Sequence, residues 1–139
     1  MSWWLAGVIA GVVAWFADYV LWSKVFMKGM ENQVTPPPAG QAVNMTPMLV
    51  KSFLLAVAFG LIFAYLFARF SPSLWVTGGG ALAGMEFATV LWLPTIALST
   101  LGTSVWYDRA RPLMNATFWA WLIRMNVAGI VVGLLLRTA

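Results

Sequence analysis

Four long apolar stretches divide the chain, with short polar segments between them. They cover about 3–27, 48–70, 74–101 and 113–136. A helix that crosses the hydrocarbon core of a bilayer needs ~20 predominantly apolar residues, and every stretch reaches that length. The pattern therefore predicts an all-α polytopic membrane protein, with one transmembrane domain over 1–139 built as an antiparallel bundle of four transmembrane helices.

The polar connections differ in length. Ser71-Pro72-Ser73 predicts a tight turn between the second and third helices, and the segment 102–112 joins the third to the fourth. The longest connection, about 28–47, contains Pro36-Pro37-Pro38. Consecutive prolines exclude a helix and favour an extended polyproline segment. We interpret this loop as a stiff linker, with a docking peptide as the alternative.

Composition strengthens the membrane interpretation. Apolar residues make up 62% of the chain and charged residues 9%, well below the usual quarter in soluble domains. The net charge of +4 comes from basic residues that stand singly or in pairs along the chain. Because no basic stripe could follow a phosphate backbone, we expect no nucleic-acid partner. The expected surroundings are a lipid bilayer.

The basic residues also predict an orientation in the cell (inner) membrane. The first and third loops hold five of them, and the opposite side holds two. Cytoplasmic loops carry an excess of Lys and Arg. We therefore expect a multi-pass protein with both termini outside the cytoplasm. The two sets are Lys24, Lys28, Lys51, Arg109 and Arg111 against Arg69 and Arg137.

Small residues recur four apart in every predicted helix. Such residues share one helix face and let two backbones approach closely in lipid. Nearly all lie toward the termini, in the predicted outer half, whereas Trp15, Trp22, Trp92, Trp119 and Trp121 lie in the inner half. We expect a bundle that is tight outside and splayed inside, although these tryptophans could simply face lipid or the interface. The predicted packing residues are Gly7, Gly11, Gly60, Gly80, Gly84, Gly129 and Gly133, with Ala56, Ala64 and Ala68 beside Gly60.

Three charged residues fall inside apolar stretches. Glu86 and Arg124 are nearly equidistant from the loop between the third and fourth helices, which predicts similar depth and a pair. An isolated charge at the bilayer centre costs ~3 kcal/mol or more, so pairing is favoured. Asp18 is a second candidate partner for Arg124. Two interpretations of the cluster remain open: a relay or polar ligand site, and an interhelical clasp.

Pro94 interrupts the third apolar stretch. Proline removes one helical hydrogen bond and usually kinks the helix. The sequence predicts a kink below Glu86, with Thr89 or Thr95 satisfying backbone groups locally.

Catalytic chemistry has few candidates. The chain contains no cysteine and no histidine, which excludes Cys/His zinc sites, His-ligated haem and the commonest general base. No phosphate-binding loop, nucleophile elbow or metal-ligand cluster is found. We therefore expect no catalytic residues, no metal and no cofactor.

Two motifs resemble a bacterial family of small four-helix integral membrane proteins of unknown function. The first is Leu21-Trp22-Ser23 followed by Phe26, and the second is the segment Tyr107-Asp108-Arg109-Ala110-Arg111-Pro112-Leu113. Together they cover about a tenth of the chain. The resemblance implies a four-helix membrane architecture and no activity, and the long proline loop departs from it.

The sequence favours a non-enzymatic accessory or scaffolding protein that packs against other integral membrane subunits or forms a homo-oligomer. This expectation depends on the small-residue faces, the abundant aromatic residues and the absence of catalytic motifs. The alternative is a small transporter, channel or lipophilic-ligand carrier that uses Asp18, Glu86 and Arg124.

Overall fold

The computed structural model describes residues 1–22 and 46–136, and in these ranges it contains helices and no strands. Four segments are long and apolar enough to cross a membrane. The elements are α1 (Trp3–Val20), α2 (Thr46–Phe70), η3 (Ser71–Ser73), α3 (Ala81–Trp92), η4 (Leu93–Ala97), α4 (Leu98–Trp106), η5 (Asp108–Ala110) and α5 (Arg111–Leu135).

The third span differs most from the sequence prediction. It runs over Ala81–Trp106 rather than about 74–101. Gly78, Gly79 and Gly80 all have positive φ, a backbone conformation that stops a right-handed helix, so 74–80 forms a loop ahead of α3. The second and fourth spans each begin two residues earlier than predicted. The end of the first predicted helix (23–27), most of the proline loop and Arg137 lie outside the described residues.

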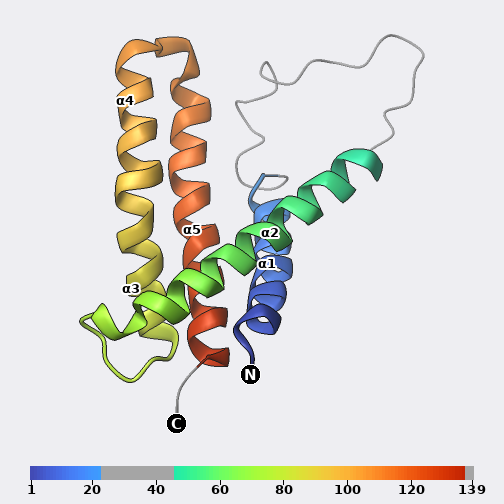
Figure 1. Cartoon of the computed structure of the whole chain (residues 1–139). Helices are drawn as coiled ribbons and strands as arrows, with labels where there is room; N and C mark the ends of the chain where they lie inside the picture. Colours follow the sequence, from blue (N-terminus) through green and yellow to red (C-terminus); the bar gives the residue numbers. More distant parts are fainter. Residues whose placement is uncertain (23–45, 137–139) are drawn as a thin grey trace.

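The helices form two tightly packed groups. α2 crosses α1 at a steep angle, whereas α3, η4 and α4 run alongside α5 as a long hairpin (Figure 1). α1 contacts α5 and thereby joins the groups. α1 begins and α5 ends at the same end of the bundle (Figure 1).

Glycines form the contact between α1 and α2. A Cβ added at Gly7 would lie 2.8 Å from the Gly60 carbonyl oxygen, and one at Gly11 would lie 2.5 Å from that of Ala56. Real Cβ atoms do not approach this closely, so the two backbones could not meet here with any larger side chain. In lipid, packing of this kind replaces the hydrophobic drive that holds soluble bundles together.

A second glycine contact joins α3 to α5. A Cβ at Gly84 would clash with the Gly129 backbone, and one at Gly133 would clash with the Gly80 carbonyl oxygen. The Gly80 amide also donates a 3.1 Å hydrogen bond to the Gly133 carbonyl. Gly80 is the N-cap of α3 and not part of its helical face, which corrects the sequence prediction. Its role is a positive φ and a backbone hydrogen bond.

Aromatic residues fill the space between the two groups. Phe63 and Phe67 of α2 meet Phe87 of α3 edge to face, with ring centroids 5.1 and 5.6 Å apart. Trp92 is buried, and its indole N–H donates a 3.1 Å hydrogen bond to the Phe118 carbonyl. Trp119, by contrast, is 53% exposed. The inner-half tryptophans thus divide between core and surface.

The helix around Pro94 has π-helical hydrogen bonding over Leu93–Ala97. This agrees with the predicted irregularity, because proline supplies no backbone donor. The Thr95 hydroxyl donates a 2.6 Å hydrogen bond to the Leu91 carbonyl. The Thr89 hydroxyl instead lies 3.4 Å from the Asn126 side-chain oxygen and so ties α3 to α5.

Candidate functional site

The candidate site is an ion pair that bridges the two helix groups. Asp18 lies in the last turn of α1, and Arg124 lies midway along α5. The Arg124 guanidinium is 3.4 Å from the Asp18 carboxylate, and the two side chains are 12% and 26% exposed. Trp22 also donates a side-chain hydrogen bond to Asp18. The pair therefore lies within apolar spans without being sealed off.

Two aromatic rings cover the guanidinium. The Arg124 guanidinium carbon lies 4.6 Å from the Trp121 ring centroid and 5.0 Å from that of Phe59. The two rings also contact each other edge to face at 5.7 Å. Cation–π attraction is strongest where water is excluded, so Phe59 and Trp121 stabilise the charge beyond what Asp18 supplies. These contacts tie α2 to α5 at the same place.

The Arg124 guanidinium is nevertheless incompletely hydrogen-bonded. Arginine has five N–H donors, and within the described residues its hydrogen bond is the long one to Asp18. Its Nε is buried and has no hydrogen-bond partner there. An arginine that pairs well with a carboxylate uses two short parallel bonds. The Arg124–Asp18 pair has one hydrogen bond, and its 3.4 Å length is close to the upper limit for a hydrogen bond.

Glu86 does not pair with Arg124, which corrects the sequence prediction. Its carboxylate oxygens accept hydrogen bonds from the backbone amides of Trp75 and Val76, at 2.7 and 2.8 Å. Glu86 thus fixes the loop 74–80 onto the start of α3 and stands apart from the Asp18–Arg124 pair. Of the three charges expected to form one cluster, the structure brings two together.

The late start of α3 explains the difference. In a helix beginning at Leu74, the amides of Trp75 and Val76 would lie ~15 Å from Glu86 along the helix axis, out of reach of its carboxylate. Because α3 begins only at Ala81, the loop 74–80 brings these two amides to Glu86, and they bind its carboxylate in place of Arg124. The glycine run was the signal in the sequence that could have revealed this.

Replacing Glu86 with alanine should loosen the loop without affecting the ion pair. The two amides of Trp75 and Val76 would lose their acceptor, and each unmet donor costs ~1–3 kcal/mol unless water reaches it. Hydrogen exchange at these amides should accelerate at least about tenfold, while exchange in α5 near Arg124 stays unchanged. Unaltered protection at both amides would show that the carboxylate does not hold the loop.

A second feature is the outward side of α4, which the sequence analysis did not single out. We call Leu98, Leu101, Gly102, Val105 and Trp106 the α4 outer face, because all are exposed and three or four residues apart. A Cβ added at Gly102 would meet nothing within 4 Å. Every other glycine inside a described helix lies against another helix. Gly102 lacks a small residue four positions away, so no spacing motif marked it.

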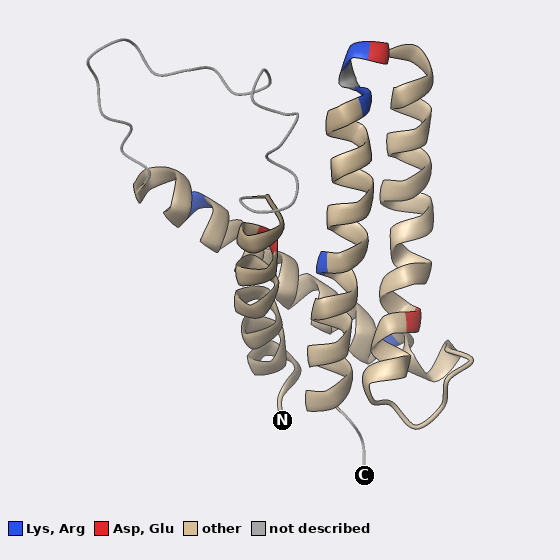
Figure 2. Ribbon diagram, turned by 180° about the vertical axis from the view of Figure 1, so that it is seen from behind, with Lys and Arg blue, Asp and Glu red and all other residues tan. Residues whose placement is uncertain are grey.

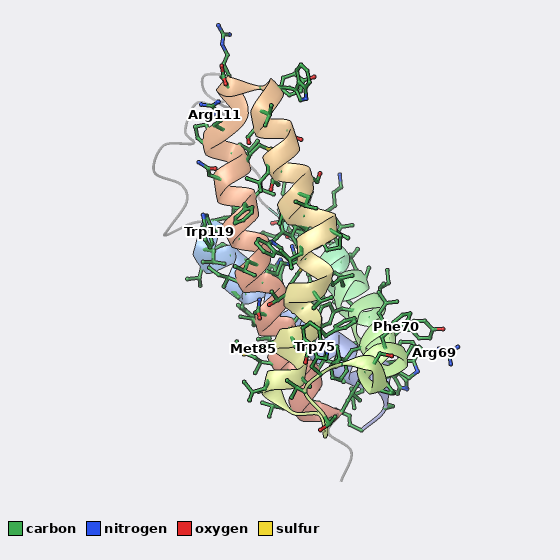
Figure 3. All side chains as sticks on the ribbon, turned by 90° about the vertical axis from the view of Figure 1, so that its left-hand side faces the viewer. Arg69, Phe70, Trp75, Met85, Arg111 and Trp119 are labelled. Atoms are coloured by element: carbon green, nitrogen blue, oxygen red, sulfur yellow. The ribbon has the colours of Figure 1, made fainter. Side chains whose placement is uncertain are left out.

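The other charged groups of the described residues lie mainly toward the ends of the bundle. Figure 2 shows few charged residues along the ribbons, and Figure 3 places Arg111 at the α4–α5 tip and Arg69 and Trp75 at the opposite end. Arg111 pairs with Asp108 at 2.9 Å. The described residues contain no group of three or more His, Cys, Asp or Glu side chains that could hold a metal ion.

A hollow of about 340 Å³ lies at the end where α1 begins, and no ionisable side chain lines it. Its lining comprises Met1, Trp3, Phe67, Ala68, Ser71, Leu135 and Leu136.

No protein-family model, curated protein or solved structure matches the chain. The family resemblance therefore depends on its two motifs alone.

Proposed function

We propose that the protein is a four-span integral membrane protein. The support is the length and apolar character of the four helices together with their glycine-based packing. Exposed apolar side chains surround the bundle, from Phe16 on α1 and Leu55 on α2 to Leu98 on α4. A soluble protein of this size rarely exposes so large an apolar surface. Lipid is the solvent in which such a surface is favourable.

The proposed orientation places both termini outside the cytoplasm, in the inner membrane. The chain has no cysteine, so a cysteine introduced at Ser2 or Tyr107 is its only thiol. In intact cells an impermeant thiol reagent should label Ser2→Cys and leave Tyr107→Cys unlabelled until the membrane is permeabilised. The reverse pattern would invert the topology, and labelling of both would exclude the four-span arrangement.

Within that membrane setting, the proposed function is that of a non-enzymatic accessory or scaffolding subunit. The α4 outer face is the observation that carries this proposal. Each other glycine within a described helix allows the backbone of a neighbouring helix to approach, whereas Gly102 has no described helix opposite it. α4 also packs mainly against α5, which leaves its outward side available to a further membrane helix.

Purification from the native membrane in mild detergent, without crosslinking, tests this proposal. We expect reproducible co-purification of another membrane subunit or of a second copy. Gly102→Leu should lose that partner while keeping its helical content, because the new side chain enters open space in the isolated chain. Isolation of wild-type protein as a lone monomer under several mild detergents would contradict an accessory role.

The transporter alternative is weakened by the separation of Glu86 from Asp18 and Arg124. A relay needs polar groups within reach of one another, and only two of the three expected groups meet. The remaining Asp18–Arg124 pair is better placed to bind a polar group of a ligand than to conduct protons or ions.

A further inference from the structure

Arg124 has donors that the described chain does not use. One N–H bonds to Asp18 at 3.4 Å, and Nε is buried without an acceptor. Inside a membrane span an unmet donor is unfavourable, because water is scarce there. A residue that keeps such donors in an apolar span is by default a candidate binding group. The missing partner is therefore an oxygen acceptor.

The charge balance decides which kind of acceptor fits. Asp18 already neutralises Arg124, so a carboxylate or phosphate would leave a net negative charge in a low-dielectric site. A cation offers no acceptor. An uncharged carbonyl oxygen accepts up to two hydrogen bonds and leaves the pair neutral.

The surroundings favour a lipophilic body for the ligand. Phe59 and Trp121 contact the guanidinium, and aromatic side chains pack well against flat or extended apolar groups. The pair itself is not sealed off, because the Asp18 and Arg124 side chains keep 26% and 12% of their surface exposed. A molecule already dissolved in the bilayer can reach the pair without crossing water.

We propose that Arg124 binds the carbonyl oxygen of an uncharged lipophilic molecule, such as a ketone, a quinone or an ester. Phe59 and Trp121 contact its apolar body, and Asp18 holds the guanidinium and balances its charge. This site goes beyond the accessory function and does not depend on it, because it lies between α1, α2 and α5 and not on α4.

A photoreactive ketone tests the proposal directly. The full-length protein is placed in nanodiscs of dialkyl ether phosphatidylcholine, which contain no ester carbonyls, and a 4-alkylbenzophenone is added and illuminated. We expect saturable crosslinks on peptides that contain Phe59 or Trp121. Arg124→Met should reduce them about tenfold, the loss expected when a charge-assisted hydrogen bond is removed. Arg69→Met removes an exposed arginine of α2 and should leave them unchanged.

Three matched competitors separate the possible occupants. Tetradecan-2-one should displace the probe, whereas tetradecane, which lacks the carbonyl, should not. Tetradecanoate should fail to displace the probe from the wild type and should displace it from Asp18→Asn, where Arg124 has lost its counter-charge.

Displacement by the alkane, or equal displacement by the carboxylate in the wild type, overturns the proposal. Crosslinks that do not saturate also overturn it, because water alone would then satisfy Arg124. The wild-type competition decides the matter even if Arg124→Met does not fold.

Discussion

Replacing Gly84 with leucine is expected to abolish the folded bundle. The α3 and α5 backbones touch at this point, and even a single Cβ would overlap the Gly129 carbonyl group. Overpacking a well-packed core typically costs ~1–3 kcal/mol, and a clash of backbone against backbone should cost more because neither side can change rotamer. Thermal unfolding of the purified protein in detergent, followed by circular dichroism, measures the effect.

Gly102→Leu is the matched control for this substitution. It makes the same chemical change inside a helix of the same hairpin, but in open space. The purified chain should unfold at or slightly above the wild-type temperature, since replacing glycine within a helix gains up to ~1 kcal/mol in propensity. Equal melting temperatures for the Gly84 and Gly102 variants would remove the argument that close backbone contact holds α3 on α5.

The second large effect is expected at the Asp18–Arg124 pair. Arg124→Leu leaves Asp18 without its counter-charge between α1 and α5. Breaking a buried pair from one side costs ~3–5 kcal/mol, and the 26% exposure of Asp18 should lower this toward ~2–3 kcal/mol. Asp18→Asn combined with Arg124→Leu should be more stable than Arg124→Leu alone, because no uncompensated charge remains.

Variants at Glu86 provide the control for this comparison of single and double variants. Glu86→Gln and Arg124→Leu should have additive effects within ~0.5 kcal/mol, because Glu86 bonds to Trp75 and Val76 and shares no partner with Arg124. Denaturant titration of the single and double variants gives both coupling energies. A large Glu86–Arg124 coupling together with none between Asp18 and Arg124 would contradict the observed pairing.

The sequence predicted the parts of the fold that depend on local patterns. Apolar length identified all four spans, and Pro94 marked the irregular turn. The four-residue spacing of Gly7 with Gly11 and of Gly129 with Gly133 identified faces that do contact other helices. These features are properties of one helix at a time, so one sequence is sufficient to find them.

Features that depend on tertiary arrangement were harder to predict. Glu86 was assigned to the wrong partner because apolar residues continue through the loop before α3 and hide its true start. The steep crossing of α2 over α1 has no local signal, nor has the choice of Phe59 and Trp121 as the rings around Arg124. Among the glycines of the described helices, Gly102 differs in having no helix against it, a property that depends on tertiary arrangement.

Photocrosslinking from the α4 outer face tests the accessory role most directly. p-Benzoylphenylalanine is placed at Val105, or at Leu55 of α2 as a control, since these residues are 71% and 70% exposed. In intact cells the account predicts a discrete protein adduct from Val105, with a second copy or another membrane protein, and none from Leu55. Adding Gly102→Leu should remove the Val105 adduct. No adduct from Val105, or equal adducts from both positions that ignore Gly102→Leu, would contradict the proposed function.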